Sequence, residues 1–363
     1  MASTTIRSID LFRARSTRSI PIQDATHTIS EIAFLITRIT LENGITGESY
    51  LLAFHYSPQA IAGALRDIRT LALSDKSRAD ASRPGEFLRH YQQESEYFGI
   101  SGIHQWASSA INIAMWDAWA KTLNQPVWKL FGTFHDRVPL YGSGGWLSYS
   151  IEELLDEVTG YVKRGFRAVK IKVGSPDQAR DIERLTRVRE AVGPHINIMM
   201  DANQGLDLPS ALDLARAAAP LRITWFEEPI THTDFAGYQH LRQHAGMSLA
   251  MGEREFSTVA LRELIARNAI DLWQPDILRL GSVEAWRDSA ALAAAHNIPV
   301  LPHYYKEYDV PLLMTIPNAF GAESFDWVDD LITHPILMRD GFAYPNQNPG
   351  WGFTFRDSFL SAL

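Results

Sequence analysis

The pattern of apolar and polar positions divides the chain near residue 137. Before that point, residues 31–40 are rich in β-branched and apolar side chains. Asn43-Gly44 separates them from a second such run at 47–52, which predicts an antiparallel hairpin. From residue 58 to residue 131 the apolar positions recur with helical spacing. We therefore expect a small α+β domain at the start of the chain.

Beyond residue 137, short apolar runs alternate with helical stretches. The runs lie at 168–173, 196–200, 223–226, 247–251, 270–274 and 298–301. Such alternation predicts a parallel sheet joined by helical crossovers. Gly142-Ser143-Gly144-Gly145 lacks the third glycine of a dinucleotide-binding turn, so the six repeated units favour a closed TIM-type α/β barrel over a doubly wound sheet. The Gly-, Asn- and Pro-rich stretch 338–352 is expected to fold back on the first domain.

Composition excludes several classes of protein. A hydrophobic share of 46% and a charged share of 21% are typical of a chain that buries a core. A net charge of −8 without a Lys/Arg-rich run argues against nucleic acid and anionic membranes as partners. The absence of cysteine rules out disulfides, zinc–thiolate sites and thiol nucleophiles. No signal-peptide stretch opens the chain, and charges interrupt every window of bilayer-spanning length, so we expect a cytoplasmic protein.

Polar residues able to do chemistry follow the apolar runs at intervals of about one strand–helix unit. One residue from each position gives the series Lys172, Asp201, Glu227, Glu253, Asp276, His303 and Glu323. Because successive parallel strands of a barrel end on the same face, these side chains are predicted to meet at its C-terminal face, where barrel enzymes place their active sites.

Three of these residues, Asp201, Glu227 and Glu253, are carboxylates from successive strands. Crowding them in a partly dry site would cost several kcal/mol of repulsion unless a cation neutralises them. An all-oxygen ligand set without cysteine suits Mg²⁺. The alternative is that they are solvated rim residues, which is the usual state of any one such carboxylate alone.

Two further groups are candidates for proton transfer. Lys170 and Lys172 alternate along one strand, so both point into the barrel, and each is expected to depress the pKa of the other until one can act as a neutral base. Asp276 beside His303 would fix the tautomer of the imidazole and raise its basicity, giving a second acid/base. The alternatives are a solvated strand face for the lysines and a structural role for the histidine.

The ordered set of motifs resembles the enolase superfamily, specifically its mandelate racemase subgroup, over nearly the whole chain. Residues 109–117 and 126–132 resemble the junction between cap and barrel in that family. The barrel motifs are Lys170-Ile171-Lys172, Met200-Asp201-Ala202-Asn203, Phe226-Glu227-Glu228-Pro229, Met251-Gly252-Glu253, Pro275-Asp276, Pro302-His303 and Glu323-Ser324-Phe325-Asp326-Trp327.

The resemblance implies a modified (β/α)7β TIM barrel under an α+β cap. The expected parts are a cap at 1–132, a barrel at 133–330, and a C-terminal segment at 331–363 that packs on the cap. It further implies that Asp201, Glu227 and Glu253 bind Mg²⁺, that Lys172 and the His303–Asp276 pair are the two acid/bases, and that Lys170 holds the substrate carboxylate. A protonated Glu323 would donate a hydrogen bond to the enediolate intermediate. Its alternative is an ordinary carboxylate paired with a lysine or arginine.

The substrate-contacting positions are less sharply defined by these motifs. Asn203 and Ser143 resemble contact positions of the subgroup but are equally common turn residues, and Glu228 is expected to form a structural ion pair. The loop 17–27 is predicted to close over the barrel. The candidates for contacts to the distal part of the substrate are Arg18, His27, Tyr50 and His55. Lys306 would either contact a distal carboxylate or pair with Glu307.

The expected reaction is abstraction of the proton α to a carboxylate of a small anionic substrate. Dehydration of an acid sugar, an aldonate or aldarate, to a 2-keto-3-deoxy acid is favoured, since segments 323–327 and 337–341 look like those of acid-sugar dehydratases. Racemisation or epimerisation of a 2-hydroxy acid is the alternative, and a metal-stabilised binding protein without catalysis is a third. We also expect a homo-oligomer.

Overall fold

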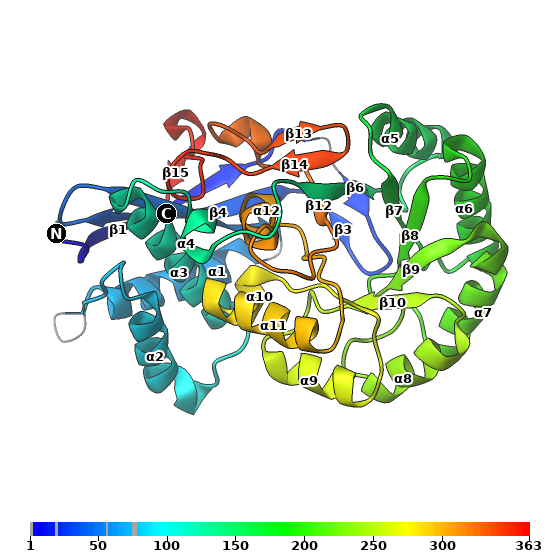
Figure 1. Ribbon diagram of the computed structural model, residues 1–363, viewed down its shortest axis with the longest axis horizontal. Helices are drawn as coiled ribbons and strands as arrows, with labels where there is room; N and C mark the ends of the chain where they lie inside the picture. Colours follow the sequence, from blue (N-terminus) through cyan, green and yellow to red (C-terminus); the bar gives the residue numbers. More distant parts are fainter. Residues whose placement is uncertain (1–2, 19–20, 56, 75–77) are drawn as a thin grey trace.

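The computed structural model describes residues 3–18, 21–55, 57–74 and 78–363. Figure 1 shows a cap beside a barrel, with both ends of the chain on the cap side. In the cap, the strands form an antiparallel sheet in the order β15-β1-β4-β5. Their bounds are β1 (Ile6–Arg15), β4 (Ile32–Leu41), β5 (Thr46–Phe54) and β15 (Ser361–Ala362), and a small separate pair is formed by β2 (Ile22–Gln23) and β3 (Thr28–Ile29).

The predicted hairpin is confirmed, since β4 and β5 pair across the turn that contains Asn43 and Gly44. The cap helices are α1 (Pro58–Ala72), α2 (Pro84–Ser95), α3 (Ile103–Thr122) and α4 (Val127–Phe131). Helix α3 packs so closely on β5 that a Cβ atom added at Gly47 would lie 2.2 Å from the carbonyl oxygen of Ala114. This contact explains glycine at that position, because any side chain would push helix and sheet apart.

The second region is a parallel barrel, as the alternating pattern predicts. Its strands are β6 (Val138–Gly144), β7 (Ala168–Lys172), β8 (Asn197–Asp201), β9 (Ile223–Glu227), β10 (Ser248–Met251), β11 (Leu272–Trp273) and β12 (Ala322–Ser324). The run at 298–301 is reduced to bridges from Val300 to Trp273 and Ala319. Parallel pairing of β12 with β6 closes the barrel.

The barrel helices form an outer ring around the strands (Figure 1). They are α5 (Ile151–Lys163), α6 (Gln178–Val192), α7 (Leu208–Ala218), α8 (Phe235–His244), α9 (Thr258–Ala266), α10 (Ile277–Leu280), α11 (Val283–Ala295) and α12 (Lys306–Leu313). After β12, the fully described stretch 325–363 contains only short 3-10 turns and strands. The fold is therefore the expected (β/α)7β modification of the TIM barrel.

The barrel interior has an apolar layer below a polar one. The apolar layer consists of Tyr141, Met199, Trp225, Ala250, Leu272 and Leu301. Side chains alternate along a strand, so the residue two positions later faces inward again at the C-terminal end. That position carries Asp201 after Met199, Glu227 after Trp225, and His303 after Leu301. Strand alternation thus places the polar residues on one face.

The C-terminal segment contacts both regions. Strands β13 (Leu337–Arg339) and β14 (Phe342–Tyr344) form a hairpin, and β14 pairs with β6 of the barrel. Strand β15 pairs with β1 of the cap. The buried carboxylate of Asp117 on α3 accepts hydrogen bonds from the backbone N–H groups of Glu48 and Trp351.

Among the described helices, none has the length and apolar character needed to cross a bilayer.

Candidate active site

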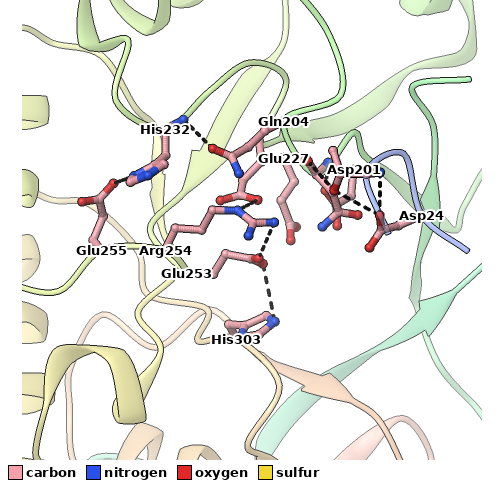
Figure 2. Close-up of polar contacts among 12 residues, drawn as sticks. Asp24, Asp201, Gln204, Glu227, His232, Glu253, Arg254, Glu255 and His303 are labelled. Carbon is pink, nitrogen blue, oxygen red and sulfur yellow. Dashed lines mark hydrogen bonds and ion pairs between the residues drawn. The ribbon is translucent and has the colours of Figure 1, made fainter. Parts of the chain in front are cut away.

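Four of the predicted strand-end residues, Asp201, Glu227, Glu253 and His303, lie close together in Figure 2. A cavity of about 200 Å³ opens there, lined from both regions. The predicted site residues that line it are His27, Lys170, Lys172, Asn203, Glu253, Asp276, His303 and Glu323. Asp201 and Glu227 are not among the lining residues, since each is only 1% exposed, but they contact the two lysines that line the cavity. Ser143 is buried beside them on β6, and its hydroxyl has no hydrogen-bond partner.

Each lysine of β7 is paired with carboxylates. Lys172 Nζ lies 2.6 Å from Asp201 Oδ2, and Lys170 Nζ lies 2.5 Å from Glu227 Oε1 and 2.7 Å from Glu323 Oε1. Burial lowers the pKa of both lysines, but these carboxylates raise it more, so both pKa values are raised. Lys170 lowers the pKa of Lys172 as expected, but Asp201 raises it more, so the net shift in this arrangement is upward and does not favour a neutral base.

The expectation of a protonated Glu323 is also corrected. Burial raises the pKa of Glu323, but Lys170 and His303 lower it more, and the net shift is downward. Its second oxygen, Oε2, accepts a hydrogen bond of 2.9 Å from the backbone N–H of Tyr304. Glu323 is thus a paired carboxylate, the alternative considered above, since Lys170 Nζ lies 2.7 Å from its Oε1.

His303 and Asp276 form the expected pair. His303 Nδ1 lies 2.8 Å from Asp276 Oδ2, and Nε2 lies 3.5 Å from Glu253 Oε2. Asp276 is held in place because its other oxygen caps α10 through the N–H groups of Leu278 and Arg279. Burial lowers the pKa of His303, but Glu253 and Asp276 raise it more. The imidazole is therefore oriented through Nδ1, with Nε2 left to exchange protons in the cavity.

The carboxylates Asp201, Glu227 and Glu253 form a donor set that fits a hard divalent cation. Asp201 and Glu227 are direct neighbours in the β8–β9 register, and Glu253 follows β10. Burial raises the pKa of Glu227 to about 7 although Lys170 opposes the shift, so negative charge is in excess here. As arranged, no three His, Asp or Glu side chains of the described residues converge closely enough to hold an ion. A cation would be bound after these carboxylates turn away from the lysines.

Two arginines of the site are missing from the sequence-based candidates. Arg254 contacts Glu228 at 2.9 Å and Glu253 at 3.4 Å (Figure 2), so Glu228 forms the expected structural ion pair. Arg279 Nη1 donates to the carbonyl oxygen of Glu253 at 2.6 Å. The sequence offers one signal for Arg254, its position directly after the predicted metal ligand Glu253. Both arginines line the cavity and restrain Glu253.

The loop 17–27 reaches the barrel, although Ser19 and Ile20 lie outside the described residues. Asp24 Oδ1 accepts hydrogen bonds from the backbone N–H groups of Thr26 and His27, and the Thr26 hydroxyl donates to the carbonyl oxygen of Asn203. His27 consequently lines the cavity. This loop therefore forms part of the cavity wall.

The other candidates for distal contacts lie elsewhere. Arg18 pairs with Asp326 outside this cavity, and His55, which does not line the cavity, accepts a hydrogen bond at Nδ1 from the backbone N–H of Ser30. Tyr50 is fully buried and donates its hydroxyl to Glu307. Its ring packs against Phe34 of the cap and against Tyr305 and Tyr308 beside it, so Tyr50 is buried between cap and barrel.

Lys306 has a supporting role in the fold. It is 1% exposed, and its ammonium group donates to Asp329 Oδ1 at 2.6 Å and to the carbonyl oxygen of Phe325 at 2.7 Å. Glu307 Oε1 is farther away, at 3.6 Å. Lys306 therefore anchors the segment after β12 and has no direct path to a substrate.

Phe325 and Trp327 of that segment form an aromatic wall together with Trp146, which follows β6, and Tyr304, which precedes α12. Trp146 and Trp327 stack with centroids 5.9 Å apart, and Phe325 lies 4.6 Å from Trp327. Lys172 Nζ lies 5.3 Å from the centroid of Trp146. All four side chains line the cavity. The wall shields the lysine side of the site from solvent.

Cap, closed barrel and strand-end acid/base groups together define a capped α/β barrel of the enolase type. The chain matches "Mandelate racemase / muconate lactonizing enzyme, N-terminal domain" over residues 7–132 and "Enolase C-terminal domain-like" over residues 153–359. The protein belongs to this family, which confirms the resemblance seen in the motifs.

Its relatives include sugar-acid enzymes and a racemase. L-Talarate/galactarate dehydratase of Salmonella typhimurium is 31% identical over 91% of this chain and 82% of its own length. L-Talarate dehydratase from Polaromonas, solved with Mg and L-glucarate, has a TM-score of 0.90 at 29% identity over 98% of this chain and 97% of that one. A racemase from Streptomyces coelicolor with bound magnesium has a TM-score of 0.91 at 26% identity, over 98% and 100%.

Proposed function

We propose that the protein is a Mg²⁺-dependent enzyme that removes the proton α to a carboxylate and dehydrates an acid sugar, an aldonate or aldarate, to a 2-keto-3-deoxy acid. The observation that carries the proposal is the placement of two acid/base groups, Lys172 and His303, around one cavity. They stand on strands separated by β6 and β12, so a substrate between them meets both. The sugar-acid relatives support the same chemistry.

In this proposal Asp201, Glu227 and Glu253 hold the Mg²⁺, which when bound supplies Lewis-acid stabilisation of charge on the substrate carboxylate. Lys170, fully buried between two carboxylates, holds the other side of that carboxylate. Lys172 takes the α-proton at Nζ. With Asp201 withdrawn from Lys172, burial and Lys170 both lower its pKa, which favours the neutral base.

His303 then serves as the acid for the leaving β-hydroxyl group. Its Nε2 donates the proton, while Asp276 at 2.8 Å from Nδ1 stabilises the charged imidazole before transfer. The aromatic wall and the loop carrying His27 exclude water from this step. The departing hydroxide and the proton from His303 leave together as water, and the enol product tautomerises to the 2-keto acid.

A second candidate is racemisation or epimerisation at the α-carbon. It is favoured by the same pair of groups, because a proton removed by Lys172 and returned by His303 from the other side inverts the carbon. The solved racemase relative adds to this possibility. The two candidates differ in where His303 delivers its proton, to the leaving β-hydroxyl group in dehydration and to the α-carbon in epimerisation.

One incubation separates them. The protein is incubated with Mg²⁺ and an acid-sugar library in D₂O. A 2-keto product supports dehydration, whereas α-deuterium uptake with inversion and no keto product supports epimerisation. Absence of both reactions with sugar acids and aryl hydroxy acids would refute the proposal and leave a binding protein. Chelation of Mg²⁺ is expected to abolish turnover, and added Mg²⁺ to restore it.

Variants then test the assigned roles. Lys172→Ala and His303→Ala are each expected to lower turnover by about 10²- to 10⁴-fold, the usual contribution of a general acid or base. Each variant should also lose exchange of only one α-epimer. Lys163→Ala, at the end of α5 and outside the cavity, is the matched control. Retention of both exchanges in either active-site variant would refute the two-base assignment.

A further inference from the structure

The cap supplies a largely apolar surface to the cavity. We define the cap wall as Ile29, Leu52, Phe54, Ile61, Ile103 and Trp106, all of which line it. They come from β3, β5, α1 and α3, so four elements of the cap form the cap wall together. Phe54 extends it to the aromatic wall, with its ring centroid 6.4 Å from that of Trp327. The part of a substrate that faces the cap therefore meets hydrocarbon and aromatic rings.

The cap brings no lysine or arginine to this cavity among the residues that the structure describes. Of the residues outside the described ranges, Ser19, Ile20 and Tyr56 carry no positive charge in the sequence, and Lys76 follows α1, whose cavity-lining residue Ile61 lies in its first half. His27 is the one basic side chain in the described cap lining, and its Nδ1 lies 3.4 Å from Asp24 Oδ1. A charge on His27 is thus matched within its own loop.

The cations that the barrel brings are matched as well. Lys170 pairs with Glu227 and Glu323, Lys172 with Asp201, Arg254 with Glu228, and Arg279 with Asp276. Arg279 also lies over the Trp106 ring, 5.1 Å from its centroid. In the proposed function Lys170 and Lys172 act at the reacting end of the substrate, so the barrel cations left for its cap end are Arg254 and Arg279, each paired with a carboxylate. A carboxylate at that end would meet no unmatched positive charge. Burying such a charge without a partner is strongly unfavourable.

We propose that the preferred substrate is a monocarboxylic 2,3-dihydroxy acid whose far end is apolar, a methyl, alkyl or aryl group that packs on the cap wall. The inference rests on the proposed function, because it places the single carboxylate beside Lys170. It narrows the proposed range to the aldonate type and excludes dicarboxylates as preferred substrates. The two classes of substrate differ only at the end that lies away from the reacting carboxylate.

The test uses pairs of acids that differ at one carbon. Each pair consists of a hexarate and the 6-deoxyhexonate with the same configuration at C2 to C5, so that a methyl group replaces the second carboxylate. Keto product and α-deuterium uptake are measured with Mg²⁺ over all available configurations, and 2,3-dihydroxy-3-phenylpropanoate is added as an aryl acid. In the pairs that react, kcat/KM is expected to be about 100-fold higher for the deoxy acid.

The outcomes separate the two proposals. A hexarate that reacts as well as or better than its deoxy partner overturns the inference while leaving the proposed function intact. No exchange and no keto product from any acid overturns the proposed function and the inference with it. Preference for the deoxy or aryl acid supports both.

Ile103→Arg tests the cap wall directly. Ile103 is 39% exposed at the start of α3, so the new side chain can be accommodated while adding a cation beside the cavity. The kcat/KM ratio of each pair should move toward the hexarate by about tenfold. Val259→Arg is the matched control, an aliphatic residue near the start of α9 that is 51% exposed and does not line this cavity. A ratio unmoved by Ile103→Arg, or moved equally by Val259→Arg, would count against the cap wall.

Discussion

Asp276→Asn tests the role of the carboxylate behind His303. Asp276 Oδ2 lies 2.8 Å from His303 Nδ1, and Oδ1 caps α10. Asparagine is as good a cap as aspartate, so its oxygen keeps the backbone hydrogen bonds while its NH₂ group faces His303. The imidazole must then accept at Nδ1 and carry its proton on Nε2. The substitution thus removes the charge that stabilises the protonated imidazole and keeps Nε2 from accepting a proton, while preserving the fold.

The magnitude follows from the lost contact. A hydrogen bond to a charged group contributes about 1.5–3 kcal/mol, which corresponds to roughly a 10- to 150-fold loss in the step that uses His303. Lys172 has no contact with Asp276 in the described structure, and its step should change by less than about threefold. We therefore expect a large loss in the step that uses His303 and a small loss in the step that uses Lys172.

The assay follows the two α-epimers separately in D₂O, with keto product measured in parallel. Thermal melting monitored by circular dichroism checks that the cap of α10 is preserved. Asp213→Asn is the control, since its side chain is 65% exposed on α7 and pairs with Arg216 on the same helix. Equal losses for both epimers, or full activity in a folded variant, would refute the assigned role of Asp276.

Three further predictions concern stability and support of the site. Burial raises the pKa of Glu157 from 4.5 to about 7, although the backbone N–H of Gly145 donates a hydrogen bond to its carboxylate. The stability that Glu157 contributes is therefore present below pH 4.5 and is lost as the pH rises through 7. In denaturant titrations, the free energy of unfolding of Glu157→Gln should exceed that of the parent by up to about 3 kcal/mol at pH 8 and should equal it at pH 4. Asp117→Ala leaves two backbone N–H groups without their acceptor and should cost about 3–5 kcal/mol in the same measurement, and a loss below about 1 kcal/mol would contradict it. Lys306→Met removes the ion-pair partner of Asp329, which anchors the segment that carries Phe325 and Trp327 of the aromatic wall. Loss of this anchor should lower kcat/KM while α-proton exchange persists. Unchanged kinetics would show that the wall does not need this anchor.

The fold class follows from local patterns that the sequence carries by itself. Runs such as 196–200 and 223–226 repeat at the length of one strand–helix unit, and this period survives in any context because it reflects burial of each strand. The run at 298–301 is less regular in space, since only Val300 forms bridges. Its position in the series, rather than its length, identifies it as a barrel strand.

The site residues are determined by the sequence, whereas their partners are determined by the tertiary structure. Alternation along β7 and β8 places Lys172 and Asp201 on the same face, but the 2.6 Å contact that reverses the expected lysine pKa shift depends on how two strands meet. Tyr50 and Glu307 pair across 257 residues, a contact that no local pattern contains. Periodicity is a property of neighbours along the chain, while charge pairing and the cap wall arise from distant segments packed together.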